Sequence, residues 1–433
     1  NGWEPYPISL RVVNWIKWAL PTGSLEPLML QSLAVQVRWL GRRLEWHLLG
    51  NHLLANAKAL VFAGLFFEGA EADGWLAKGL AILGRELPEQ ILADGGHFEL
   101  SPMYHAIILE DLLDILNLAR ASGKGREPVI ARLADVTACM RTWLAAMTHP
   151  DGGIAFFNDA AFEVAPDLAA LEDYAANACG LAHASDASFG DQGSRVVSLP
   201  EPEPSIATLR DSDPSIAALP DSGYVRLQAG PAVLIADVGA IGPDYLPGHA
   251  HADTLAFELS LHGRRAIVNS GTSTYEADAE RLRQRGTAAH NTVVVDSADS
   301  SEVWSSFRVA RRARPMNVQW GSDPDGTLWL RAAHDGYLRL PGKVIHHREW
   351  RLRPGSLRVV DRLEGRFASA EARFYLHPDA DPRDLGVGAD SGLRIEASTW
   401  HPRFGVSEPN RVLVADFSGR AEHVTEFRWP VAG

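Results

Sequence analysis

The first half of the chain carries hydrophobic residues three or four positions apart, the spacing of one helix face. Glycine, proline and Asp-Gly pairs separate the stretches, as is typical of helix ends. The stretches are residues 25–49, 53–67, 75–92, 104–118, 129–147 and 168–182. Repeated antiparallel helical hairpins of this length predict an (α/α) toroid or solenoid rather than a small bundle.

The second half consists of short alternating or β-branched runs, separated by turns. They are residues 224–228, 232–238, 254–261, 265–269, 292–296, 327–334, 344–352, 356–362 and 372–377. This spacing predicts an antiparallel β-sandwich. Residues 198–222 repeat the motif Pro-Ser-Ile-Ala and are rich in proline, which predicts an exposed linker. We therefore expect an α+β multidomain protein with a helical domain at 1–197, this linker, and a β-sandwich at 223–433.

Composition narrows the classes of function. A chain of 433 residues exceeds the usual size of one core, which agrees with two domains. Its net charge of −13 argues against a general nucleic-acid binder, and no apolar run is long enough to span a membrane. The two cysteines exclude a disulfide scaffold and a cysteine-rich zinc module. The 13 tryptophans include candidates for stacking on sugar rings, and arginine predominates over lysine, which suits carboxylate or sulfate recognition.

Three polar clusters interrupt the hydrophobic pattern. The first is Asn51-His52 at a helix start, where the alternative to a functional role is a simple helix cap. The second runs from Asp94-Gly95-Gly96 to Tyr104-His105, where Ser-Pro begins a new helix and its first turn presents a phenol and an imidazole.

The third cluster is Gly-His-Ala-His-Ala-Asp at residues 248–253, followed later by His290-Asn291-Thr292. His249 and His251 share one strand face by period-2 alternation. Two such histidines and a distant third are a reasonable metal constellation, although paired histidines are more often hydrogen-bonded structure.

Taken together, these segments resemble the heparinase II/III-like family of polysaccharide lyases. The resemblance covers most of the chain. It is carried by five ordered motifs: the opening Trp-Glu-Pro-Tyr-Pro with residues 11–15, Asn51-His52, the run ending at Tyr104-His105, residues 248–253, and Asn269-Ser-Gly-Thr through Tyr275 to His290-Asn-Thr. The family fold implies an incomplete (α/α) toroid followed by antiparallel sheets. Because this chain shows fewer helices than such toroids usually have, we expect upstream residues to be missing or removed by processing.

The family's activity implies a role for each polar residue type. Its members cleave uronic-acid polysaccharides, such as heparin-like chains or alginate, by β-elimination. The enzyme must neutralise the uronate carboxylate while a base removes the C5 proton and an acid protonates the leaving oxygen. By resemblance, Asn51 holds the carboxylate and His52 assists it or acts as base.

The resemblance assigns the remaining catalytic roles to two tyrosines and a third histidine. Tyr104 donates the proton and, for some sugar stereochemistries, is also the base. His249 reaches into the cleft from the β-domain, and Tyr275 is a candidate second phenol. A tyrosine has a pKa of about 10, so a base role requires a cationic neighbour such as His52, His105 or an arginine.

The family metal pattern is incomplete in this chain. It has a histidine, an aspartate 18 residues later, and the histidine of His-Asn-Thr, which correspond here to His251, Asn269 and His290. A neutral amide in place of a carboxylate lowers affinity for zinc. The resemblance implies a weakly held structural zinc that fixes the β-domain loops, and no organic cofactor.

Arginines are candidates for binding substrate charge. Together with His105, we expect one set to bind uronates: Arg281, Arg283 and Arg285. A second set is Arg308, Arg311, Arg312 and Arg314, and for both sets a solvated charged face is the alternative.

The expected partner is an acidic polysaccharide or oligosaccharide, in a periplasmic or secreted bacterial setting, with the cytoplasm as the alternative. The sequence leaves the oligomeric state and the identity of the uronate polymer open. Two other functions stay open: a catalytically inactive carbohydrate-binding protein, and a glycoside hydrolase that uses Asp94, Glu99 or Asp111, since hydrolysis needs two opposed carboxylates.

Overall fold

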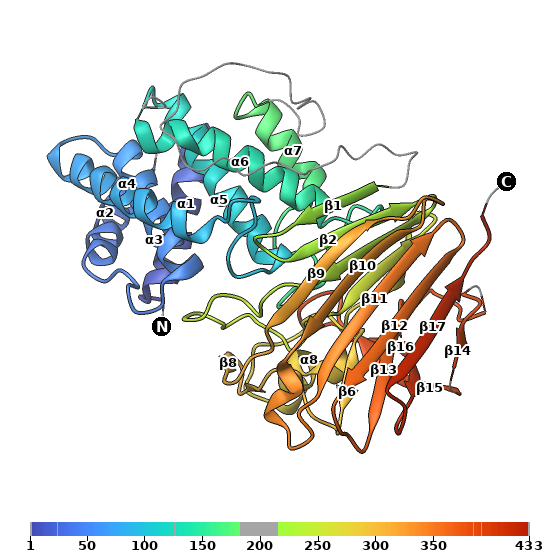
Figure 1. Cartoon of the computed structure of the whole chain (residues 1–433). Coiled ribbons are helices and arrows are strands. Elements are labelled where there is room, and N and C mark those ends of the chain that lie inside the picture. Colours follow the sequence, from blue (N-terminus) through green and yellow to red (C-terminus); the bar gives the residue numbers. More distant parts are fainter. Residues whose placement is uncertain are drawn as a thin grey trace. The chain divides into compact units, whose positions relative to one another are not determined.

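A computed structural model of the chain describes residues 2–23, 25–124, 127–181, 215–383, 385–390 and 392–431 (Figure 1). Within these residues the chain divides into two compact units. The helical unit contains residues 2–98, 104–142 and 169–181, and the β unit contains residues 99–103, 143–168 and 215–431.

Helices are the main elements of the described residues before position 182. They are α1 (Pro5–Thr22), α2 (Pro27–Gly41), α3 (Gly50–Phe66), α4 (Ala70–Gln90), α5 (Pro102–Ala121), α6 (Pro128–Ala146) and α7 (Leu168–Asn177). All six stretches with helical spacing therefore contain a helix, although the first is helical only to Gly41. The spacing did not single out α1. None of the described helices is both long enough and apolar enough to cross a lipid bilayer.

Close packing against α4 makes α3 the buried helix of this unit. Nearly every residue of α3 is buried, and its partner approaches at two glycines. A Cβ on Gly64 would lie 2.5 Å from the backbone nitrogen of Leu76, and one on Gly79 would lie 2.9 Å from the carbonyl oxygen of Ala57. Both positions therefore require glycine. This packing fixes the helix that begins with Asn51 and His52.

The β unit contains two large antiparallel sheets. The first has the order β1-β2-β3-β4-β5-β13-β16-β15, with β6 paired to β13, and the second has the order β14-β17-β12-β11-β10-β9. The first sheet uses β1 (Ser215–Leu219), β2 (Tyr224–Ala229), β3 (Ala232–Asp237), β4 (Phe257–Leu261), β5 (Arg264–Ile267), β6 (Val293–Val295), β13 (Ala370–Leu376), β15 (Leu393–Trp400) and β16 (Glu408–Asp416). The second uses β9 (Pro315–Ser322), β10 (Leu328–His334), β11 (Ile345–Arg353), β12 (Ser356–Glu364), β14 (Gly388–Ala389) and β17 (Glu422–Arg428).

One hydrophobic core joins the two sheets. Phe257 and Phe374 from the first sheet share it with Trp350 and Phe427 from the second. The burial of β11 alternates residue by residue, as expected for a strand with one face toward a core. All nine strands predicted from the sequence are present within a few residues of their expected bounds.

Smaller elements of the β unit include helix α8 (Ala279–Arg285) and the hairpin of β7 (Val303–Trp304) and β8 (Arg308–Val309). Figure 1 shows α8 beside this hairpin. Both lie in the long connections between sheet strands, where the sequence pattern gave no strand signal.

The predicted linker at 198–222 needs correction at its end. Its residues up to 214 lie outside the described part of the chain. Residues 215–219 form β1, which pairs with β2 over five residues, so the sheet begins before Gly223. The proline content of the surrounding segment obscured the short apolar run Ile216–Leu219, which contains no proline.

Candidate active site and metal-binding cluster

Asn51 and His52 lie in the first turn of α3. Asn51 is buried, whereas about a third of the His52 side chain is exposed. The ring of Tyr6 on α1 packs against His52 with 4.5 Å between ring centroids. The residue before this helix, Leu49, has a φ of 58°, a conformation that is costly for a residue with a side chain. The backbone is therefore strained where it presents these two side chains.

A buried glutamate orients His52. Nδ1 of His52 lies 3.2 Å from Oε1 of Glu45, so this nitrogen carries the proton and donates it to the carboxylate. The other carboxylate oxygen accepts a hydrogen bond from Asn56 Nδ2 at 2.9 Å. In the neutral form of the ring, the remaining nitrogen, Nε2, carries the lone pair and can accept a proton. Sequence reasoning missed Glu45, because nothing in the spacing distinguishes it from a surface carboxylate.

Tyr104 and His105 lie in the first turn of α5, and the His105 ring is hydrogen-bonded within the helical unit. Nδ1 of His105 accepts the backbone N–H of His97, and Nε2 donates to the carbonyl oxygen of Met140 at 2.9 Å. Burial lowers the pKa of His105 to about 3, so the ring is neutral. Because both nitrogens are engaged inside the unit, we do not include His105 among the proposed substrate-binding residues or cations. Tyr104 is 9% exposed.

In the β unit, Asp159 is the centre of a buried network. Its carboxylate accepts hydrogen bonds from His249 Nδ1 at 2.9 Å and His251 Nε2 at 2.8 Å, and it forms a two-point ion pair with Arg281. Burial alone would raise the pKa of Asp159, but the Arg281 charge and the histidine hydrogen bonds hold it well below its usual range. Asp159 therefore fixes both histidines of the Gly-His-Ala-His motif.

His249 also approaches a second carboxylate. Its Nε2 lies 3.4 Å from Oε2 of Glu99, which is almost fully buried. His249 itself is 15% exposed, and its ring lies 6.1 Å from that of Tyr275. The structure thus brings together two of the predicted catalytic residues, His249 and Tyr275. It places them in the β unit, while Asn51, His52 and Tyr104 belong to the helical unit.

The structure brings His251 and His290 together in a buried cluster, but the third member is Asp253 rather than the predicted Asn269. Their ring nitrogens and an oxygen of Asp253 all lie within 4.8 Å of one another. The amide of Asn269 is engaged elsewhere: Nδ2 donates to the carbonyl oxygen of Phe156, and Oδ1 faces the backbone N–H of Asn291 at 3.4 Å.

The donor atoms of this cluster fit a metal ion. Nδ1 of His251 and both ring nitrogens of His290 are buried and have no hydrogen-bond partner among the residues that the structure describes. Burial lowers the pKa of His251 to about 4 and that of His290 to about 3, so both rings are neutral. Because Asp159 accepts the other nitrogen of His251, its free nitrogen has the orientation typical of a metal-bound histidine. The cluster is therefore compatible with a metal.

A buried arginine of the second sheet fastens the segments that carry this cluster. Arg348 on β11 pairs with Asp361 on β12 through two nitrogens. Its third nitrogen donates to the carbonyl oxygens of Leu255 and Asn291, which lie next to the cluster in the sequence. Leu255 has a φ of 66° and Asn158, beside Asp159, a φ of 56°. Strain recurs at these segments as it does before Asn51.

The three arginines expected to bind uronates have other partners. Arg281 is fully buried against Asp159 and donates to the carbonyl oxygen of Ser306. Arg285, also fully buried, donates to the carbonyl oxygens of Ala250 and Ser305. These two arginines therefore position the histidine motif and the β7–β8 hairpin.

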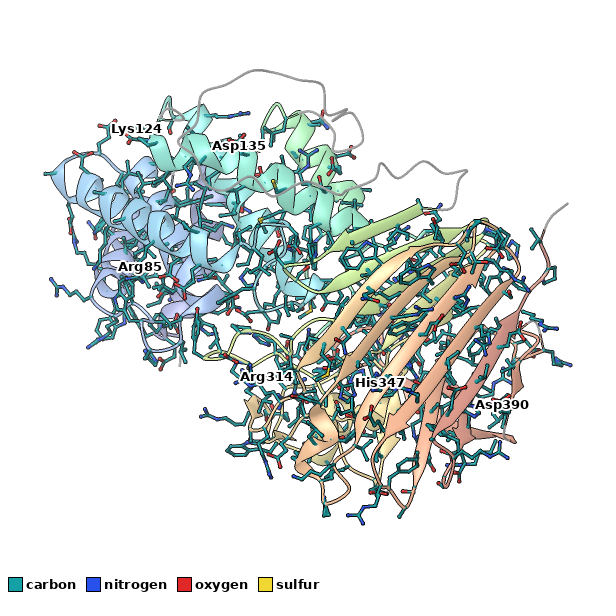
Figure 2. The ribbon with its side chains drawn as sticks, viewed as in Figure 1. Arg85, Lys124, Asp135, Arg314, His347 and Asp390 are labelled. Atoms are coloured by element: carbon teal, nitrogen blue, oxygen red, sulfur yellow. The ribbon has the colours of Figure 1, made fainter. Side chains whose placement is uncertain are left out.

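Arg283 is partly exposed and pairs with Glu280. In the second set, Arg311 pairs with Glu302 and Arg312 with Asp244, whereas the Arg314 side chain is exposed (Figure 2). Most of these charges are thus already neutralised within the unit.

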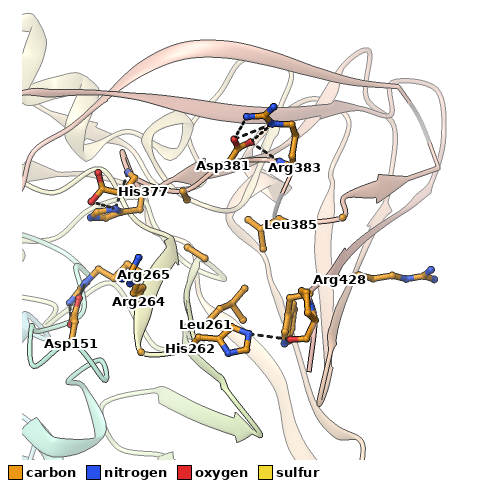
Figure 3. A pocket seen from close by; sticks show the side chains of 17 residues that line it. Asp151, Leu261, His262, Arg264, Arg265, His377, Asp381, Arg383, Leu385 and Arg428 are labelled. Atoms are coloured by element: carbon orange, nitrogen blue, oxygen red, sulfur yellow. Dashed lines mark hydrogen bonds and ion pairs between the residues drawn. The ribbon is translucent and has the colours of Figure 1, made fainter. Parts of the chain in front are cut away.

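A cavity of about 900 Å³ opens at another place in the β unit (Figure 3). The β4–β5 turn, residues 377–386 and the end of β17 contribute to its described lining, which includes none of the candidate catalytic side chains. Two of its arginines are paired, Arg265 with Asp151 and Arg383 with Asp381. The chemistry predicted from the sequence therefore does not lie in this cavity.

The carboxylates proposed for a hydrolase are committed to structural contacts. Asp94 accepts the backbone N–H of Gly96, and Asp111 pairs with the buried Lys58 at 2.6 Å. Glu99 faces His249, as described above. These contacts give no support to an opposed pair of carboxylates.

Curated relatives of the chain are heparin-sulfate lyases. The protein from Bacteroides stercoris is 25% identical over 320 residues, which is 70% of this chain and 45% of the relative. The protein from Pedobacter heparinus is 25% identical over 346 residues, 77% of this chain and 47% of the relative. The chain therefore spans about half the length of the curated relatives that it matches.

A solved structure of heparinase III superimposes on the whole chain and on 70% of its own length, with a TM-score of 0.76 and 18% identity. This likeness establishes the expected fold, an incomplete (α/α) toroid followed by an antiparallel β-sandwich. The heparinase II/III N-terminal model matches residues 24–176, and the heparinase II/III-like C-terminal model matches residues 211–430. With both parts matched in order, the chain belongs to the heparinase II/III family.

Proposed function

We propose that this chain carries the catalytic part of a polysaccharide lyase that cleaves a uronate-containing, glycosaminoglycan-like polymer by β-elimination. The product is an unsaturated uronate with a double bond between C4 and C5. The observation that carries the proposal is the Glu45–His52 pair beside Asn51: an imidazole that a buried carboxylate orients through Nδ1, next to a buried amide. These groups supply a base and a carboxylate-binding donor.

Each proposed role follows from the chemistry of the side chain. The amide N–H of Asn51 binds the uronate carboxylate, which stabilises the charge that develops when the C5 proton leaves. His52 accepts that proton through Nε2, and Tyr104 donates its phenolic proton to the leaving oxygen. His249, held by Asp159, binds the sugar, with Tyr275 next to it.

The metal that fits the buried cluster is zinc, held by His251, His290 and Asp253. These are the nitrogen and carboxylate donors that zinc favours, and Asp253 supplies the carboxylate that the family pattern places at position 269. When bound, the ion neutralises buried negative charge and ties two loops together. It has no part in the proton transfers.

A panel of uronate polysaccharides, namely heparan sulfate, heparin, chondroitin sulfate, hyaluronan and alginate, tests the proposal. Cleavage is followed by the ultraviolet absorbance of the conjugated double bond and by product size. The heparin-sulfate lyase relatives favour heparan sulfate as the best substrate. Absence of the absorbance with every polymer would refute the proposed reaction.

A further inference from the structure

We propose that Tyr275, Phe307 and Phe404 form an aromatic platform that stacks on a sugar ring of the substrate, with Arg308 binding the acidic group of the same saccharide. The proposal rests on the proposed function, because it assigns a binding subsite to that substrate. None of the sequence motifs assigned Phe307 or Phe404 a role.

The three rings of the platform contact one another at steep angles, with interplanar angles of 60° between Tyr275 and Phe307 and 72° between Tyr275 and Phe404. The ring centroids of Tyr275 and Phe307 are 5.3 Å apart, and those of Tyr275 and Phe404 are 4.8 Å apart. The ring of His249 lies 6.1 Å from both Tyr275 and Phe307. The platform is therefore next to the histidine that we place at the substrate.

Packing within the β unit leaves Phe307 and Phe404 partly exposed. Phe307 is 41% exposed and Phe404 36%, although both side chains are fully apolar. They come from separate segments that converge on Tyr275. A cluster of exposed aromatic rings from distant segments is typical of a binding surface, since a single exposed ring would need no explanation.

The support beneath the platform is rigid. Arg281 lies under two of the rings, with its guanidinium carbon 5.0 Å from the centre of Tyr275 and 5.4 Å from that of Phe307. It also donates to the carbonyl oxygen of Ser306, next to Phe307. The Phe404 loop is tied to the Tyr275 segment by the hydrogen bond from Gly405 N–H to the Ser273 carbonyl oxygen at 2.9 Å. A preorganised surface loses little entropy on binding.

Arg308 gives the platform its charge preference. It follows Phe307 in the hairpin, is exposed, and has no side-chain hydrogen-bond or ion-pair partner among the described residues. Nearby arginines in the sequence, Arg311 and Arg312, are paired with Glu302 and Asp244. An unpaired guanidinium in a chain of net charge −13 is suited to a carboxylate or sulfate.

This combination favours an acidic saccharide over other ligands. A pyranose ring presents polarised C–H groups on its face, which match the negative face of an aromatic ring. Its carboxylate or sulfate groups project from the edge of the ring, where the guanidinium of the residue that follows Phe307 can bind them in two-point fashion. A purely apolar partner would leave Arg308 without an anion.

Binding without turnover tests the platform. The probe is a heparan sulfate hexasaccharide, titrated calorimetrically into the full chain carrying Tyr104→Phe to suppress cleavage. We expect Phe307→Ala and Phe404→Ala each to raise Kd about fivefold or more, and Phe307→Tyr to retain the affinity. Arg308→Gln should weaken binding and lower its salt dependence.

Two substitutions serve as matched controls. Ile395 on β15 is 56% exposed, so Ile395→Ala removes an exposed apolar side chain away from the platform segments. Arg358 on β12 is exposed without a side-chain partner among the described residues, so Arg358→Gln matches Arg308→Gln. Both should bind the hexasaccharide like the parent.

The outcomes separate the platform from the proposed function. If Phe307→Ala and Phe404→Ala both bind within twofold of the parent, or if the parent does not bind the hexasaccharide, the platform proposal is overturned. Absence of cleavage by the chain with Tyr104 intact would instead refute the lyase reaction, and the affinities would still decide the platform.

Discussion

Replacing Glu45 with glutamine should inactivate His52 without removing any of its neighbours. The backbone N–H of Glu45 donates to Asn56 Oδ1 at 2.9 Å, which fixes the orientation of that amide. Its Nδ2 group therefore donates to Oε2 of residue 45, and to Ser9 Oγ. A glutamine at position 45 must present its oxygen to Asn56 and so its NH2 group to His52.

The consequence is a change of tautomer. Nδ1 of His52 would accept a hydrogen bond from the new NH2 group, and the proton would move to Nε2, which can then no longer act as a base. Loss of a general base costs about 10²- to 10⁴-fold in kcat, which is about 3 to 5 kcal/mol. The number of hydrogen bonds is unchanged, so the free energy of unfolding should fall by only about 1 kcal/mol.

The assay is the initial rate of double-bond formation on the best substrate of the panel, with urea denaturation as the test of folding. The double variant Glu45→Gln with Asn56→Asp is the matched control. An aspartate at position 56 accepts the glutamine NH2 group, which turns the glutamine oxygen back to His52 and restores the tautomer. We expect it to recover a large part of kcat. A Glu45→Gln variant that keeps more than a third of kcat, or a double variant as inactive as the single one, would refute this reasoning.

Three further predictions concern stability and metal binding. The pKa of His105 is lowered to about 3, below its unfolded value of about 6.5. Its contribution to stability is therefore complete above pH 6.5 and is lost as the pH falls toward 3. In urea denaturation, the free energy of unfolding of His105→Gln should depend less on pH than that of the parent. Between pH 6 and 4 we expect its slope to be shallower by about 1.4 kcal/mol per pH unit, and an unchanged slope would contradict this. Asp159→Asn leaves Arg281 buried without its anion, so the free energy of unfolding should fall by about 3–5 kcal/mol. Adding Arg281→Gln should recover part of this loss. A loss below about 1 kcal/mol for Asp159→Asn would oppose the prediction. Protein dialysed without chelators should retain about one equivalent of zinc, measured by atomic absorption. Asp253→Asn should lose the zinc and Asn269→Ala should keep it. The reverse pattern would restore Asn269 as the ligand.

The sequence predicted the helices and strands more completely than the contacts between their side chains. Hydrophobic period and glycine or proline punctuation were sufficient for α2 to α7 and for the core strands, because burial of one face imposes that period. α1 escaped notice although Ile8, Val12 and Ile16 line its buried face. β15, β16 and β17 were not among the strands named from the sequence pattern.

Motifs and resemblance had singled out His249 and Tyr275, and His251 and His290, and the structure places the members of each pair close together. The carboxylates that orient the histidines could not be predicted. Glu45 lies in a segment without a motif, and Asp159 lies far in the sequence from the histidines that it orients. By charge alone, Arg281 and Arg285 of α8 look like substrate ligands, and only their burial and contacts show that they hold Asp159 and the hairpin.

The masses of the cleavage products test the central claim most directly. Elimination breaks the C4–O bond without adding water, so the masses of the products of the best substrate should sum to that of the parent. Hydrolysis adds one water for each bond broken. We predict masses without added water and an unsaturated uronate with a C4–C5 double bond; products heavier by one water for each cleavage would contradict the account.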